Sequence, residues 1–130
     1  MSGLLLDTHA FLWWLDGDPR LPAVRRQQLL NPDAEVYVSA VSAWEIAIKS
    51  ALGKLPGADD VARDVAHAVR GQGFRELPML FSHAHMTGRL PGHHRDPFDR
   101  LLIAQGLVED MAIISIDTAF DAYGVERLWG

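Results

Sequence analysis

Two short apolar runs, each followed at once by an aspartate, constrain the fold of this 130-residue chain more than any other feature. Residues 4–6 precede Asp7, and the largely apolar residues 111–116 precede Asp117. Neither run alternates apolar with polar side chains, and such a run is typical of a strand buried on both faces, as in a parallel sheet. We therefore expect two interior strands of an α/β domain, each with an acid at its carboxyl end.

Strand and helix patterns alternate along the rest of the chain, which predicts a mainly parallel sheet with helices between its strands. Further strands are expected at residues 35–39, 74–77 and 125–129. Helices are expected at residues 10–15, 22–30, 42–52, 59–70, 82–90 and 96–108, with a turn or short helix at 118–123. The sequence contains no linker, repeat or low-complexity segment, so residues 1–130 are expected to form one domain.

Composition narrows the classes of function. The net charge of −5 argues against broad electrostatic binding of nucleic acid, although an acidic site could bind a phosphodiester through a metal cation. The chain has no cysteine, which excludes thiolate metal sites and fits a reducing cytoplasm. No apolar run approaches the roughly 20 residues of a membrane-spanning helix, and the first apolar run lacks the basic region of a signal peptide. We expect a cytoplasmic protein without a membrane partner.

Five acids are predicted to gather at one edge of the sheet, because strand ends and helix starts share that edge in a parallel sheet. They are Asp7, Glu45, Asp96, Asp99 and Asp117. Like charges seldom gather without a counter-ion, and Mg²⁺ or Mn²⁺ prefers carboxylate oxygens and water. Such a site supports metal-assisted hydrolysis of a phosphodiester.

Each of these acids also has a structural explanation. Asp96 is placed to cap the helix that follows it, and Asp99 stands at the capping-box position three residues later. Ser42 and Glu45 have the spacing of a second capping box, and Glu45 and Lys49 have the spacing of a surface ion pair. We therefore interpret Asp96 as a cap first and as a metal ligand second.

Other polar side chains give weaker signals. His83 and His85 are two residues apart, so they face roughly opposite sides of a helix and are interpreted as surface histidines. His94, Arg95 and Arg100 flank the acidic helix start and are candidates to contact a substrate phosphate. Salt bridges to the neighbouring acids would explain the two arginines equally well.

Four blocks of the sequence together resemble a PIN-domain protein, and most closely a VapC-type toxin of a type II toxin–antitoxin system. The blocks are Leu5-Leu6-Asp7-Thr8-His9, residues 39–46 (Ser39 to Ile46), residues 94–105 (His94 to Gln105) and Ile114-Ser115-Ile116-Asp117. The resemblance implies a three-layer α/β/α fold with a mainly parallel central sheet of four to five strands. It also implies an endoribonuclease that depends on Mg²⁺ or Mn²⁺.

The same resemblance implies roles for particular residues and partners. Asp7, Glu45, Asp99 and Asp117 take the positions of the catalytic, metal-binding acids, and Asp96 belongs to the same block. Ser115 stands where the family commonly has a threonine, and it keeps the hydroxyl. A homodimer, an RNA substrate and a cognate VapB-like antitoxin that covers the active site are also implied.

Two other functions stay open on the sequence. A non-catalytic binding protein with the PIN fold would use the acids only as caps and antitoxin contacts. An aspartate-nucleophile phosphatase would use Asp7 to attack a phosphate, but that class has a second aspartate two residues on, where this chain has His9. The sequence does not select the RNA target or the number of metal ions.

Overall fold

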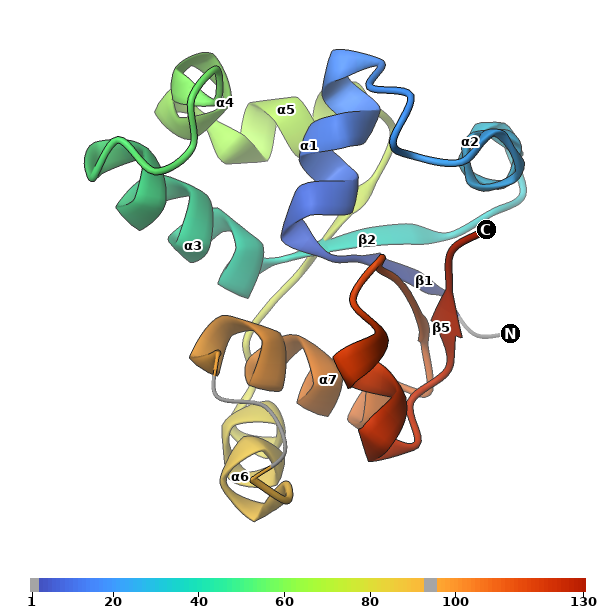
Figure 1. Cartoon of the computed structure of the whole chain (residues 1–130), viewed down its shortest axis with the longest axis vertical. Helices are drawn as coiled ribbons and strands as arrows, with labels where there is room; N and C mark the ends of the chain where they lie inside the picture. The colour runs from blue at the N-terminus through green and yellow to red at the C-terminus, as the bar shows by residue number, and fades with distance from the viewer. Residues whose placement is uncertain (1–2, 93–95) are drawn as a thin grey trace.

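Five strands form one sheet in the computed structural model, which describes residues 3–92 and 96–130 (Figure 1). The strand order is β3-β2-β1-β4-β5, and every neighbouring pair is parallel. The strands are β1 (Leu4–Leu6), β2 (Val36–Ser39), β3 (Arg75–Leu77), β4 (Ala112–Ile114) and β5 (Arg127–Leu128). All five expected strands are confirmed: β1 has the length of its apolar run, and the other four are shorter than predicted.

Helices cover both faces of the sheet, so the expected three-layer α/β/α fold is confirmed (Figure 1). The helices are α1 (Thr8–Asp16), α2 (Ala23–Leu30), α3 (Ala40–Ala51), α4 (Asp59–Arg63), α5 (Val65–Gly71), α6 (Phe81–Arg89), α7 (Pro97–Glu109) and the 3₁₀ helix η1 (Thr118–Tyr123). No helix within the described part of the chain has the length and apolar character needed to cross a membrane.

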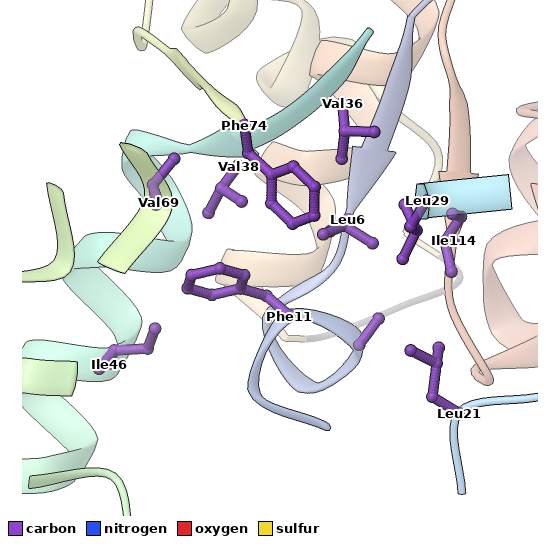
Figure 2. Packing of buried hydrophobic residues seen from close by; sticks show 11 residues of the cluster. Leu6, Phe11, Leu21, Leu29, Val36, Val38, Ile46, Val69, Phe74 and Ile114 are labelled. Atoms are coloured by element: carbon purple, nitrogen blue, oxygen red, sulfur yellow. The ribbon is translucent and has the colours of Figure 1, made fainter. Parts of the chain in front are cut away.

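The central strand β1 contributes to two separate cores because successive side chains of a strand point to opposite faces. Leu6 packs with Phe11 of α1 and Val38 of β2 in one core, as Figure 2 shows. Leu5 faces the other core, where it packs with Ile103 of α7. Burial on both faces explains the continuous apolar runs that marked these strands in the sequence.

The start of α3 differs from the expectation. Ser39, at the end of β2, is the N-cap: its Oγ accepts a hydrogen bond of 2.9 Å from the backbone N–H of Val41. The predicted capping box at Ser42 and Glu45 is therefore wrong, and Glu45 lies beyond the first turn. The strand leads into the helix without a loop, so the N-cap lies three residues earlier than the spacing of Ser42 and Glu45 suggested.

The prediction of a single helix over residues 59–70 is also wrong, because this segment forms two helices, α4 and α5. Asp64 separates them with a non-helical backbone (φ −156°, ψ 81°), and its carboxylate accepts a hydrogen bond of 3.0 Å from the backbone N–H of His67. Aspartate is among the best N-cap residues, and here the local cap outweighs the continuous amphipathic pattern.

Candidate active site

Asp7 is a buried acid at the carboxyl end of β1, with 7% of its surface exposed. Its Oδ1 accepts a hydrogen bond of 2.8 Å from the backbone N–H of Ala10 and so caps α1. Burial raises the pKa of the Asp7 carboxyl above its usual 3.8, and the negative charge of Glu45 raises it further. The hydrogen bonds from Ser115 and Ala10 lower this pKa, but by less than burial raises it. A desolvated carboxylate beside a second acid is a favourable place for a cation.

Glu45 is the second buried acid, with 3% of its surface exposed. The hydroxyl of Thr8 lies 2.6 Å from Glu45 Oε1 and 2.9 Å from Ser42 Oγ, so side chains of α1 and α3 together fix this carboxylate. Lys49 pairs with Oε2. The predicted pair of Glu45 and Lys49 is confirmed, but it is not a surface pair, because the carboxylate is buried.

Asp117 follows β4 and caps η1, where its Oδ1 accepts a hydrogen bond of 2.9 Å from the backbone N–H of Ala119. Its own backbone N–H donates to Ser115 Oγ at 3.0 Å. Ser115 is fully buried and also hydrogen-bonds to the carboxylate of Asp7. The hydroxyl of Ser115 thus contacts acids that follow the neighbouring strands β1 and β4.

Asp96 caps α7, as expected: its Oδ1 accepts hydrogen bonds from the backbone N–H groups of Phe98 (2.9 Å) and Asp99 (3.3 Å). Asp99 lies in the first turn of the same helix. Both acids are close enough to Lys49 for their charges to raise the pKa of its ammonium group. The start of α7 therefore faces the segment of α3 that carries Glu45.

These contacts connect the five predicted acids along one edge of the sheet. Within residues 3–92 and 96–130, however, no three acidic or histidine side chains lie close enough, in their present orientations, to hold one metal ion between them. A magnesium ion commonly uses one or two protein carboxylates and keeps several waters. The buried carboxylates of Asp7 and Glu45 offer the hard oxygen ligands that a partly hydrated Mg²⁺ or Mn²⁺ ion requires.

The three candidate contacts to a substrate phosphate have different outcomes. His94 and Arg95 lie outside the described residues. Arg100 donates hydrogen bonds to the main-chain carbonyl oxygens of Thr87 (3.1 Å) and Leu90 (3.0 Å), at the end of α6. This bonding favours a structural role for Arg100, which ties α6 to α7.

His83 was predicted at the surface, and this prediction is wrong, because the residue is fully buried. Its Nδ1 accepts a hydrogen bond of 3.0 Å from the backbone N–H of Leu80, and its Nε2 lies 2.7 Å from a carboxylate oxygen of Glu109. Gln105 bonds to the same ring and lies 2.5 Å from Ser39 Oγ. A buried polar chain therefore runs from α6 through α7 to the cap of α3.

Sequence reasoning did not identify Thr8 or Ser42 as parts of the site. A signal was available for both: Thr8 directly follows the strand-ending Asp7, and Ser42 stands three residues before Glu45, on the same helical face. For His83 the signal was its position three residues after Leu80, where a side chain can accept the backbone N–H of an N-cap residue. His85 is exposed, as predicted.

Comparison with known proteins identifies the family. The family model of the PIN domain matches residues 4–126. One similar solved structure is VapBC2 from Rickettsia felis bound to a promoter DNA fragment, with a TM-score of 0.72, 12% sequence identity and 98% of each chain covered. Another is DNA-bound VapBC from Salmonella typhimurium, with a TM-score of 0.72, 14% sequence identity and 98% of each chain covered. FitAcB from Neisseria gonorrhoeae is also similar, with a TM-score of 0.65, 20% sequence identity and 96% of each chain covered.

No curated protein matches the sequence. At these low identities the solved structures show the fold alone, and they agree with the α/β/α arrangement described above. The family model extends over nearly the whole chain and includes all five acids of the site. The chain therefore belongs to the PIN domain family.

Proposed function

We propose that this protein is a metal-dependent endoribonuclease that acts as the toxin of a toxin–antitoxin pair. The observation that carries the proposal is the burial of Asp7 and Glu45, from separate segments, at the edge where Asp99 and Asp117 also lie. Membership of the PIN domain family supports phosphodiester chemistry at this edge. The similar structures, named VapBC and FitAcB complexes, support the toxin role.

Asp7, Glu45, Asp99 and Asp117 would hold Mg²⁺ or Mn²⁺, with Asp96 as a further candidate. A cation bound there would activate water and neutralise charge on the phosphate. The protein's own contribution is orientation: Ala10 and Ser115 fix the carboxylate of Asp7, and Thr8 fixes that of Glu45. Ligands held in place by outer hydrogen bonds need little rearrangement when the cation binds.

The electrostatics of the chain support dependence on a cation. The protein carries a net charge of −5, and the site gathers acids, so an RNA phosphate would be repelled from the metal-free site. Chelation of the metal should therefore abolish both cleavage and productive binding of RNA.

The direct test is incubation of purified, antitoxin-free protein with a mixed RNA pool in Mg²⁺, in Mn²⁺ and in EDTA. We expect cleavage with either cation, none in EDTA, and recovery when Mn²⁺ is added in excess. Cleavage that persists in EDTA would contradict the metal-dependent mechanism. A folded protein that cleaves no RNA would favour the non-catalytic alternative, and a trapped phosphate on Asp7 would favour the phosphatase.

We propose two protein partners, a VapB-like antitoxin and a second copy of this chain. The antitoxin is supported by the complexes to which the fold is similar. The second copy is supported by an apolar stripe formed by Trp44 and Ile48 of α3 and by Leu52, the C-cap of this helix, which are 56%, 37% and 62% exposed. Trp44 and Ile48 are four residues apart, so they lie on one face of the helix that carries Glu45.

A further inference from the structure

Lys49 places a positive charge inside the acidic edge. Its Nζ forms an ion pair with Glu45 Oε2, one turn earlier on α3. The side chain of Glu45 is 4% exposed and that of Lys49 is 27% exposed. A solvated surface pair is strongly screened and contributes little. Here the carboxylate end is buried, so the ammonium group is the nearest compensating charge for an acid that the proposed function assigns to metal binding.

The ammonium group also faces α7. Its Nζ lies 5.5 Å from the centroid of the Phe98 ring, in the first turn of that helix. Burial lowers the pKa of Lys49, but the hydrogen bond and charge of Glu45, together with the charges of Asp96 and Asp99, raise it by more. A lysine ammonium group is positively charged at neutral pH, and that of Lys49 lies between Glu45 of α3 and the first turn of α7.

We propose that Lys49 is an exchangeable counter-ion of the active site: it neutralises Glu45 in the metal-free protein, is displaced from that carboxylate by a divalent cation, and then binds a phosphate oxygen of the RNA. This inference rests on the proposed function. Two cations at one carboxylate oxygen repel each other, so the ammonium group and the metal compete for Glu45. The long, flexible lysine side chain allows the ammonium group to move to a new anion.

The proposal predicts that loss of the Lys49 charge strengthens binding of the divalent cation and weakens binding of the RNA phosphate. Without Lys49, the acids carry one more uncompensated negative charge, so they attract a divalent cation more strongly. The same loss removes a positive charge that would bind the phosphate. An ion pair that merely stabilised α3 would give no such opposite effects.

The test measures Mn²⁺ binding by RNA-free protein, using electron paramagnetic resonance of the free ion. The variants are Lys49→Met and Lys49→Gln, which remove the charge, and Lys49→Arg, which keeps it. Lys54→Met is the matched control, because Lys54 is the other lysine of the sequence and is exposed just beyond α3. We expect Mn²⁺ affinity to rise roughly tenfold in both charge-removing variants. It should stay within about twofold of wild type in the other two.

At saturating Mn²⁺, the KM for RNA should rise in Lys49→Met and stay at the wild-type value in Lys54→Met. Unchanged or weaker Mn²⁺ binding in both charge-removing variants, each checked for folding by thermal denaturation, would overturn the role of Lys49 while leaving the metal site intact. A wild-type protein that binds no Mn²⁺ would overturn the proposed metal site, and the role of Lys49 with it.

Discussion

Asp7 combines two properties that oppose each other in the metal-free protein. It caps α1 and accepts a hydrogen bond from Ser115, yet its carboxylate is buried next to Glu45. Burial raises its pKa, so the folded state holds the proton more tightly than the unfolded state does. Between the unfolded-state pKa of 3.8 and the raised folded-state value, the free energy of unfolding falls as the pH rises. Above pH 3.8, the burial of Asp7 therefore destabilises the metal-free fold, because the buried carboxyl resists ionisation.

Asp7→Asn should consequently stabilise the metal-free protein at neutral pH. Asparagine keeps a cap oxygen for the N–H of Ala10 and carries no charge, so the gain should vanish as the pH falls below 3.8. The measurement is the melting temperature in EDTA across this pH range. Added Mg²⁺ should raise the melting temperature of wild type and leave that of the variant unchanged. A variant that melts below wild type at neutral pH would contradict this account.

For single residues, the sequence predicted the roles that depend only on position in a strand or helix. Asp7, Asp96 and Asp117 cap the elements that follow them, as their places at strand ends and at a helix start suggested. The burial of Glu45 and His83 was not predictable in the same way. It depends on Thr8 from α1 in the first case and on Glu109 of α7 in the second, and these contacts join distant parts of the chain.

Among the elements, α3 is the helix whose placement most directly affects the site, because it carries Glu45 and Lys49. Its first turn is held by Ser39, which is 1% exposed, accepts the N–H of Val41 and lies 2.5 Å from Gln105 Oε1. Ser39→Ala removes the cap and leaves a buried amide oxygen without this partner. We expect a loss of about 2–3 kcal/mol in the free energy of unfolding.

Urea denaturation measures this loss, with Ser50→Ala as the matched control on the same helix. Ser50 hydrogen-bonds to Asp59 at the surface, so its replacement should change the free energy of unfolding by no more than about 0.5 kcal/mol. If Ser39→Ala proved as stable as Ser50→Ala, Ser39 would not be the cap that positions α3.

Strands and helices were predictable to different degrees. The strands were evident because burial on both faces leaves a continuous apolar run. The start of α3 and the break at Asp64 were missed, because hydrophobic spacing does not record where a capping side chain interrupts or begins a helix. Ser39 and Asp64 are both residue types that favour this position, so composition at the boundary carried information that periodicity did not.

For the whole molecule, parallel topology explains why several of the acids could be assigned to one edge of the sheet before any contact was known. β1 lies between β2 and β4, so the segments after these strands meet at one edge. The order of elements along the chain was sufficient to place Asp7, Glu45 and Asp117 there. It was not sufficient to orient them, because orientation depends on packing among α1, α3 and α7.

The apolar stripe of α3 predicts a dimer in solution, with a mass twice the 14.4 kDa of the chain. Trp44→Glu places a charge within the stripe and should give a monomer by sedimentation equilibrium, since an unpaired charge is not tolerated in an apolar interface. Phe81→Glu is the control, because Phe81 of α6 is 92% exposed and lies outside the stripe. A monomeric wild type, or a dimeric Trp44→Glu variant, would contradict the assignment of this face.

The central claim is that acids from separate segments act together as one hydrolytic site. The most direct measurement is RNA cleavage in Mn²⁺ by Asp7→Asn, Glu45→Gln, Asp99→Asn and Asp117→Asn, beside the exposed control Asp60→Asn of α4. We predict that each of the four folded variants loses cleavage by at least about a hundredfold, while the control retains the wild-type rate. Wild-type cleavage by a folded Asp7→Asn variant would contradict the claim.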